Sequence, residues 1–143
     1  YEVVYLYKSG FKNVHVIDLA RQPLDKIKEE IPEFPDSQLI YGDFFNLEIQ
    51  DFDLILEQTF FCALNPELRK NYVQKMFQLL KPGGRLAGLL FDFPLTLNGP
   101  PFGGSLKEYQ ELFHLTFTIN VLARANNSIP PRKDKELFFI FEK

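Results

Sequence analysis

Acidic residues follow three short apolar runs of this chain, at the points where the strands of a parallel sheet would end. Asp18 follows the run NVHVI, Asp43 follows QLIYG, and Glu57 follows FDLIL. Open α/β sheets bind small molecules at the carboxyl ends of their parallel strands. Carboxylates there accept hydrogen bonds from hydroxyls or amines. The pattern therefore indicates a site for a charged small molecule.

The residues around Asp18 and Asp43 suit the two parts of a nucleoside. A carboxylate directly after an apolar strand can accept hydrogen bonds from two ribose hydroxyls, a role that Asp18 fits. Asp43 can accept from an exocyclic amine while Phe44 packs on a purine face. Each acid also has a simpler interpretation. Asp18 could interact with the dipole of a following helix, and Asp43 could be a turn residue before two core phenylalanines.

The other reactive side chains are few and far apart. Cys62 is expected to be a small buried residue rather than a nucleophile, because no histidine lies near it in the sequence. His15 lies within an apolar run and His114 at the end of a helical pattern, so both are expected to be structural. Their spacing matches no metal site, and we predict no metal. No residue is assigned as catalytic.

Two polar or flexible segments near the C-terminus complete the set of candidates. The segment LNGPPFGG at 97–104 is rich in proline and glycine, and Phe102 in it could close over a ligand as a lid. The segment SIPPRKDKE carries Arg132 and Lys133, which could meet an anionic substrate. The alternatives are a plain loop at a sheet edge and an exposed pair of cations.

Apolar periodicity divides the chain into alternating helices and strands. Helices are expected at 3–9, 23–31, 66–80 and 105–114, and strands at 13–18, 38–41, 52–56, 85–92, 117–123 and 137–141. Pro32 and the sequence LKPGG end two of the helices, and Gly10 ends the first. Ser105 and Glu108 form the pattern of a capping box.

The alternation predicts an α/β fold with a mostly parallel, doubly wound sheet. The stretch from 124 to 136 has no helical pattern, so the last two strands are expected to form an antiparallel hairpin. Dinucleotide dehydrogenases continue with further strand–helix units, whereas class I methyltransferases end in such a hairpin. The fold class is therefore predicted to be a Rossmann-like methyltransferase sheet.

Length and composition bound the class of protein. A chain of 143 residues with 45% hydrophobic residues fits one domain with a real core. The net charge of −3 and the pI near 5.4 argue against nucleic-acid binding. One cysteine excludes an internal disulfide and suits a reducing compartment. With no membrane-span or signal-peptide pattern, we expect a cytoplasmic protein that binds neither membrane nor nucleic acid. Its oligomeric state is not assigned.

The ordered motifs together resemble the thiopurine methyltransferase superfamily, and within it the branch of halide and thiol methyltransferases. The resemblance covers nearly the whole chain, through GDFF at 42–45, QTFFCAL at 58–64, NPELR at 65–69, LKPGG at 80–84, GPPF at 99–102 and IPPRKDKE at 129–136. It implies S-adenosylmethionine as the methyl donor. It also implies a small-molecule acceptor with a soft nucleophile, such as a thiol, a thiopurine or a halide.

The resemblance assigns roles to residues of this chain. Asp18, with Leu19 beside it, would hold the ribose, and Asp43 with Phe44 would frame the adenine. The residues expected to bind the donor are Asp18, Leu19, Asp43, Phe44, Glu57 and Gln58. Those expected to bind the acceptor are Phe60, Phe61, Phe102 and Arg132. The chain departs from the family at Gln58, where the plant-type enzymes usually have tyrosine.

A second departure concerns the start of the chain. The helix at YEVVYL matches the one that follows the glycine-rich loop of the family, and neither that loop nor the strand before it is present. We therefore expect residues 1–143 to be a single methyltransferase domain that lacks its first strand. Two other functions stay open: a non-catalytic, methyltransferase-like interaction module, and an NAD-dependent oxidoreductase that keeps Asp18 for the ribose.

Overall fold

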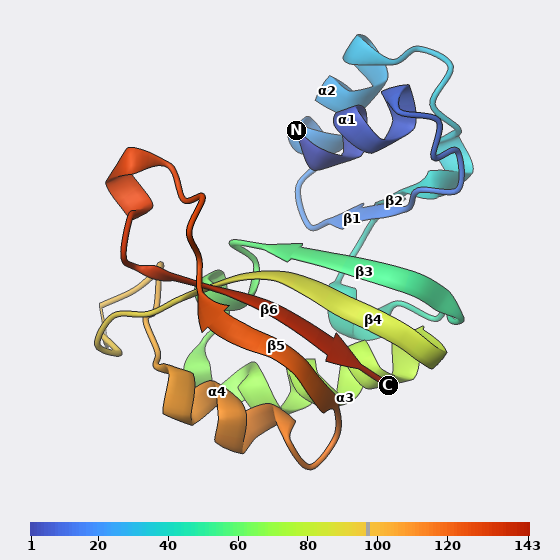
Figure 1. The fold of residues 1–143 in the computed structure, drawn as a ribbon. Helices are drawn as coiled ribbons and strands as arrows, with labels where there is room; N and C mark the ends of the chain where they lie inside the picture. The colour runs from blue at the N-terminus through green and yellow to red at the C-terminus, as the bar shows by residue number, and fades with distance from the viewer. Residues whose placement is uncertain (97) are drawn as a thin grey trace. The chain divides into compact units, whose positions relative to one another are not determined.

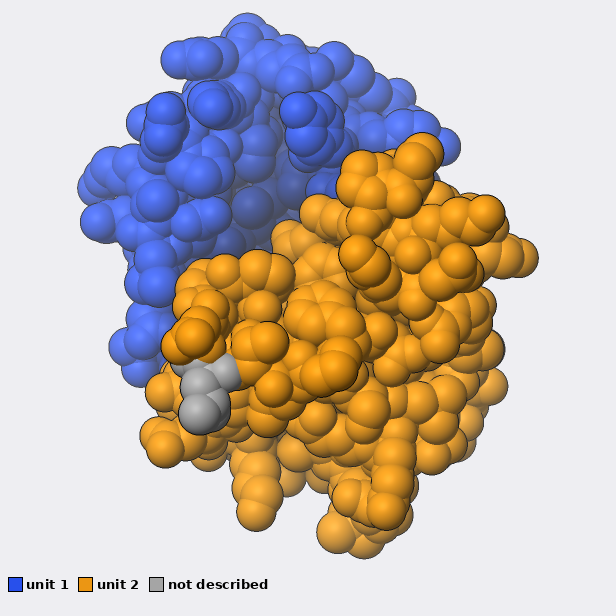
Figure 2. All heavy atoms as spheres, turned by 90° about the vertical axis from the view of Figure 1, so that its left-hand side faces the viewer, with its two compact units in different colours: residues 1–48 blue, residues 49–143 orange. Residues whose placement is uncertain are grey.

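The computed structural model describes residues 1–96 and 98–143. Leu97, the first residue of the expected lid segment, lies outside the described residues. The chain divides into two compact units, residues 1–48 and residues 49–143 (Figure 2). We expected one domain; this organisation stays a prediction, and the two units are described separately.

Unit 1 is a βαβ arrangement preceded by a short helix. Its two strands are parallel, with Val16 opposite Leu39 and Asp18 opposite Tyr41. A helix joins them, as a parallel connection requires. In chain order its elements are α1 (Glu2–Lys8), β1 (Val16–Asp18), α2 (Arg21–Glu30), η1 (Asp36–Gln38), β2 (Leu39–Tyr41) and η2 (Phe44–Asn46).

The small core of unit 1 forms where both helices meet the strand pair. Tyr7, Ile31 and Phe34 are buried there, and the Tyr7 and Phe34 rings lie 4.8 Å apart. Gly10 follows α1 with a φ of +100°, the left-handed conformation that the sequence predicted for the end of this helix. The predicted start of α2 at Pro23 was wrong by two residues. Proline is tolerated within the first turn of a helix, so α2 begins at Arg21.

Unit 2 is a four-stranded sheet in the order β3-β4-β6-β5. In this sheet β3 and β4 are parallel, while β6 runs antiparallel to both β4 and β5. Helices α3 and α4 lie side by side on one face of it (Figure 1). In chain order the elements are β3 (Phe52–Gln58), η3 (Phe61–Ala63), η4 (Pro66–Leu68), α3 (Arg69–Leu79), β4 (Leu80–Phe91), α4 (Leu106–Phe113), β5 (Thr118–Arg124), η5 (Pro130–Arg132) and β6 (Glu136–Glu142).

The predicted α/β class and the C-terminal antiparallel hairpin are confirmed. The hairpin pairs β5 with β6, and β6 also pairs with β4 along seven residues. The boundaries differ in places. The strand expected at 52–56 continues through Glu57 and Gln58, and the helix expected at 66–80 is the short η4 followed by α3. Within the described residues β1 pairs with β2 alone and β3 with β4 alone.

The core of unit 2 lies between the sheet and the two helices. Along β6, Leu137, Phe139 and Phe141 are buried while Phe138 between them is 40% exposed. Phe141 lies 4.6 Å from both Phe113 and Phe139, measured between ring centroids. Such aromatic contacts stabilise a core beyond the area that they bury. No described helix is both long and apolar enough to cross a membrane.

Phe138 and Phe139 offer a matched test of this core, because they are neighbours on opposite faces of β6. Phe139→Ala should lower the free energy of unfolding by about 3–5 kcal/mol, since it leaves a cavity in the aromatic layer. Phe138→Ala should cost about 1 kcal/mol. Chemical denaturation of the two variants measures the difference, and equal losses would contradict this placement of the core.

Candidate functional site

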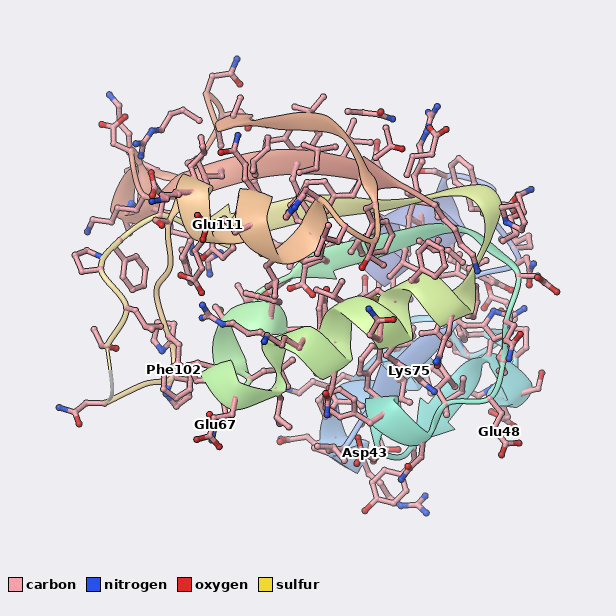
Figure 3. All side chains as sticks on the ribbon, turned by 90° about the horizontal axis from the view of Figure 1, so that it is seen from below. Asp43, Glu48, Glu67, Lys75, Phe102 and Glu111 are labelled. Atoms are coloured by element: carbon pink, nitrogen blue, oxygen red, sulfur yellow. The ribbon has the colours of Figure 1, made fainter. Side chains whose placement is uncertain are left out.

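Asp18 and Asp43 lie at the same end of the strand pair in unit 1. Asp18 is the last residue of β1, and the backbone N–H of Gly42 donates to its carbonyl oxygen at 3.0 Å. Asp43 follows Gly42 directly and is the N-cap of η2; Figure 3 labels it. The parallel register therefore brings together the two acids that the sequence singled out.

Each of these acids forms the same local turn. Oδ1 of Asp18 accepts from the N–H of Ala20 at 2.7 Å, and Oδ1 of Asp43 accepts from the N–H of Phe45 at 2.9 Å. Such Asx turns hold a carboxylate in one orientation. Within the described residues, no hydrogen bond engages Oδ2 of either acid. Two oriented carboxylates with an available oxygen each are what a sugar diol and an amine require.

The apolar neighbours of these acids differ in exposure. Leu19 is 68% exposed beside Asp18, whereas Phe44 is 7% exposed and packs edge-on against Phe45 at 5.3 Å. Leu19 therefore offers an open apolar surface, while most of the Phe44 ring is already covered. The framing of an adenine by Phe44 stays a prediction.

In unit 2 the strand β3 ends in a buried carboxylate. Glu57 is 3% exposed, and its Oε1 accepts from the N–H groups of Phe60 and Phe61 at 2.9 and 3.0 Å. Its Oε2 accepts from the hydroxyl of Tyr72 at 2.7 Å. Both oxygens are thus used within the protein. Glu57 holds the turn after β3, and its expected contact with a donor stays a prediction.

Burial shifts the pKa values around Glu57 in one direction. It raises the pKa of the Glu57 carboxyl, although the hydrogen bonds from Phe61, Tyr72 and Phe60 oppose the shift. Burial and the Glu57 charge also raise the pKa of the Tyr72 hydroxyl far above its ordinary range. The same two causes raise the pKa of the Cys62 thiol. A thiol with a raised pKa is a poor nucleophile, which supports the structural role expected for Cys62.

The turn that Glu57 holds presents one ring outward and one inward. Thr59 adopts a left-handed backbone conformation with a φ of 63°, which is uncommon for a β-branched residue. Gln58 is exposed, and Phe60 is 37% exposed. Phe61 is 1% exposed and lies 5.0 Å from the Tyr72 ring and 5.8 Å from the Tyr109 ring. Of the two phenylalanines in this turn that were expected to contact an acceptor, Phe60 is therefore accessible and Phe61 belongs to the core.

The expected lid is part of the 93–104 loop, of which the structure describes residues 93–96 and 98–104. The N–H of Gly104 donates to the Phe93 carbonyl at 2.9 Å, and the N–H of Phe102 donates to the Cys62 carbonyl at 2.7 Å. Figure 3 labels Phe102 on this loop. The ring of Phe102 is partly exposed. Phe102 is thus fastened beside the turn that carries Phe60.

The glycines of this loop serve close packing rather than a left-handed backbone conformation. Positive φ angles occur at Gly10 and Gly83 but at none of the loop glycines. A Cβ on Gly103 would lie 2.3 Å from the Phe93 carbonyl oxygen, and one on Gly104 would lie 2.2 Å from the Tyr109 hydroxyl. The missing side chains are what allow the loop to lie against its neighbours.

Arg132 is only partly available to an anion. Its Nη1 lies 3.4 Å from Oε1 of Glu136, whose side chain is buried, and its guanidinium lies 5.5 Å from the centre of the Phe91 ring. About a third of the Arg132 side chain remains exposed, at 32%. In the described parts of the chain, no group of three His, Cys, Asp or Glu residues could hold a metal ion.

The sequence interpretation missed Arg69, which is 3% exposed at the start of α3. Its guanidinium pairs with Glu108 and donates through Nη2 to the Gly103 carbonyl at 2.7 Å. The helical spacing of the sequence could have shown that Arg69 is buried. Tyr72, Val73 and Met76 follow Arg69 by three, four and seven residues, so all four share the buried face.

The model of the thiopurine S-methyltransferase family matches residues 12–143. A probable thiol methyltransferase of Arabidopsis thaliana is 33% identical over 141 residues, which cover 95% of this chain and 62% of that protein. A thiopurine S-methyltransferase of Vibrio cholerae is 38% identical over 87 residues, covering 60% of this chain and 40% of that protein. The chain thus spans less than two thirds of the length of these relatives.

The fold of this chain is similar to the folds of several solved structures. The 1,6-didemethyltoxoflavin-N1-methyltransferase of Burkholderia thailandensis, solved with 1,6-didemethyltoxoflavin and S-adenosylhomocysteine, matches with a TM-score of 0.75. At 19% identity it covers 97% of this chain and 64% of its own. A TehB-like SAM-dependent methyltransferase of Corynebacterium glutamicum matches with a TM-score of 0.71 at 19% identity, over 99% of this chain and 73% of its own. These likenesses confirm the Rossmann-like methyltransferase fold.

The buried Glu57 predicts a specific dependence of stability on pH. The folded chain keeps the Glu57 proton to higher pH than the unfolded chain, whose value is the ordinary one near 4.5. The Glu57 contribution to the free energy of unfolding is therefore fully present below that value and is lost as pH rises through the raised pKa. Glu57→Gln removes this contribution, so wild type should lose stability relative to the variant over the pH range above the ordinary value near 4.5.

Urea denaturation across this pH range measures the difference, with Glu67→Gln on the exposed η4 as the control. Glu57→Ala should lower stability by about 3 kcal/mol throughout the range, because two backbone N–H groups and the Tyr72 hydroxyl lose their acceptor. A gap between wild type and Glu57→Gln that does not change with pH would contradict the buried carboxyl.

Proposed function

The chain belongs to the thiopurine S-methyltransferase family, and from this premise we propose that the protein is an S-adenosylmethionine-dependent methyltransferase. Its proposed acceptor is a small molecule with a soft nucleophile, such as a thiol, a thiopurine or a halide. The observation that carries the proposal is the pair of oriented carboxylates, Asp18 and Asp43, at one end of the strands of unit 1. The relatives that match the chain include a thiol and a thiopurine methyltransferase by name.

The residues of unit 1 fit the nucleoside part of the donor. Oδ2 of Asp18 can accept from the ribose hydroxyls while Oδ1 stays on the Ala20 N–H. Asp43 can accept from the adenine amine in the same way, with its own turn keeping the carboxylate in place. Leu19, exposed beside Asp18, offers apolar surface to the adenine ring. Each of these contacts with the donor uses a carboxylate oxygen or an apolar surface that no other group of the protein occupies in the described residues.

Methyl transfer depends on the alignment of the reactants more than on proton transfer. When bound, S-adenosylmethionine supplies an electrophilic methyl group on a positively charged sulfur. The attacking atom of the acceptor, the methyl carbon and the donor sulfur must lie in line for the transfer. Positioning and the exclusion of water therefore contribute most of the rate. The described residues fit this demand, because the raised pKa of the Cys62 thiol and of the Tyr72 hydroxyl keeps both groups protonated.

We propose that the acceptor side is formed by residues of unit 2. Phe60 and Phe102 keep exposed ring surface on two segments that a hydrogen bond joins, from the Phe102 N–H to the Cys62 carbonyl. Gln58, exposed at the end of β3, is kept as a contact of the donor and not of the acceptor. Arg132, with a third of its side chain exposed at 32%, can meet an anionic group of the acceptor. These groups would shape an apolar site with a cation at its margin.

A non-catalytic interaction module is the second candidate. It is favoured by two residues expected to bind the donor, because both oxygens of Glu57 are engaged within the protein and Phe44 is only 7% exposed. The NAD-dependent oxidoreductase is not retained, because the C-terminal hairpin and the family both favour a methyltransferase. We further propose a cytoplasmic location without nucleic-acid or membrane binding, on the basis of the single cysteine and the net charge of −3.

Titration of the full-length gene product with S-adenosylhomocysteine tests the donor site. Asp18→Asn and Asp43→Asn should each weaken binding by about tenfold, since each replaces an acceptor of charge-assisted hydrogen bonds by a neutral amide. Asp25→Asn, on the exposed part of α2, is the matched control and should bind as wild type does. Isothermal calorimetry measures all four proteins. If wild type does not bind S-adenosylhomocysteine at millimolar concentration, the methyltransferase proposal is refuted and the interaction module remains.

A pair of acceptors tests the role of Arg132. Arg132→Met should raise KM for 2-mercaptobenzoate by about tenfold and leave KM for the neutral thiophenol within about twofold, because only the first acceptor carries a carboxylate. Lys133→Met, the neighbouring exposed cation, should change neither value. Methyl transfer from labelled donor measures the constants. If KM rises equally for both acceptors, Arg132 does not recognise the charge.

A further inference from the structure

Arg69 is a buried cation that contacts three different segments of unit 2. It is 3% exposed, and its Nη1 pairs with the carboxylate of Glu108 on α4. Its Nη2 donates to the carbonyl of Gly103 at 2.7 Å. Its guanidinium lies 4.8 Å from the centre of the Phe61 ring, in the turn after β3. One side chain at the start of α3 therefore joins that turn, α4 and the 93–104 loop.

The segment that Arg69 holds is the one that carries Phe102. Gly103 lies between two residues whose N–H groups are also engaged, Phe102 with the Cys62 carbonyl and Gly104 with the Phe93 carbonyl. A Cβ on Gly103 would clash with Phe93, and one on Gly104 would clash with Tyr109. The backbone at these two glycines is therefore packed directly against those residues. The hydrogen bond from Arg69 to Gly103 adds a charged donor to this arrangement. These three contacts hold the backbone at and just after Phe102.

Stability alone is a weak reason for this arginine. Burial of a charged pair costs about as much as the pair returns, and a well-packed apolar residue at such a place is often at least as stable. Arg69 in addition leaves its buried Nε without a hydrogen-bond partner among the described residues. What an apolar residue could not do is donate to the Gly103 carbonyl while bound to α4. The particular contribution of Arg69 is therefore the placement of the loop.

We propose that Arg69 is a positioning residue for the acceptor side of the reaction. It fixes the segment of Phe102 beside the turn that carries Phe60, so the apolar surface for the acceptor is formed before the acceptor binds. Preorganisation of this kind increases affinity because less order has to be created on binding. The proposal rests on the proposed methyltransferase function for its catalytic part. The placement of the loop by Arg69 stands on the contacts alone.

Two measurements on Arg69→Met test the proposal in the full-length protein. Amide hydrogen exchange at Phe102 and Gly104 should quicken by about tenfold, because loss of the charged donor loosens both neighbouring hydrogen bonds. KM for thiophenol should rise by about tenfold, while the dissociation constant of S-adenosylhomocysteine stays within about twofold. Arg69→Lys keeps the charge but not the forked geometry, so it should restore part of the affinity for thiophenol.

The controls separate this role from a general loss of stability. Arg85→Met removes the exposed pair with Glu142 and should leave exchange and kinetics unchanged. Glu108→Gln, with 36% of the Glu108 side chain exposed, keeps a hydrogen-bond acceptor for Arg69 and should give a smaller change in the same direction. This second variant carries the test if Arg69→Met does not fold.

Each remaining outcome decides a defined part of the proposal. Unchanged exchange at Phe102 and Gly104 would overturn the placement of the loop, whether or not the protein methylates anything. Faster exchange with equal losses in thiophenol and S-adenosylhomocysteine binding would overturn the acceptor-specific role and leave a structural one. A wild type that binds S-adenosylhomocysteine but never methylates thiophenol also overturns the acceptor role as stated. Failure of the wild type to bind S-adenosylhomocysteine would count against the proposed function, while exchange would still decide the placement of the loop.

Discussion

The carboxylate of Glu57, buried at the end of β3, is the interaction on which the rest of unit 2 depends. An acid removed from water needs donors for both oxygens, and here two come from the turn that follows the strand and one from Tyr72 of α3. The turn is thereby given one conformation, despite the unfavourable backbone angle at Thr59. Strand, turn and helix become one rigid body. An apolar residue at this position would leave all three donors without an acceptor.

The effect extends from Glu57 through the ring that its turn directs inward. Phe61 enters the core among Tyr72, Tyr109 and Phe113, and the guanidinium of Arg69 lies over it. From Arg69 the contacts continue to Glu108 and to the loop at Gly103. A single buried carboxyl group thus begins a chain of contacts that ends at a partly exposed aromatic ring, that of Phe102. The residues that would face a substrate are placed by residues that would not.

Local patterns predicted most of the elements and part of the site. Periodicity and helix ends located the helices and strands, and the lack of a helical pattern before β6 predicted the hairpin. The acids after β1 and β2 were found because a strand end is visible in the sequence. The insertion of β6 between β4 and β5 depends on pairing between distant segments, which no local pattern records. Glu57 and Asp18 look alike in sequence, because both follow an apolar run; only packing shows that one is buried and the other open. The glycines of the 93–104 loop likewise allow bends or close contact, and only the neighbours decide.

The place of β6 has a consequence for how the protein is made. Strands β4 and β5 do not pair with each other, and β6 is hydrogen-bonded to both. A growing chain that has emerged as far as Arg124 therefore has β4 with one edge whose backbone N–H and C=O groups are still unpaired. Unit 2 can close only once residues 136–142 have left the ribosome, so its cooperative folding must come after nearly all of its synthesis.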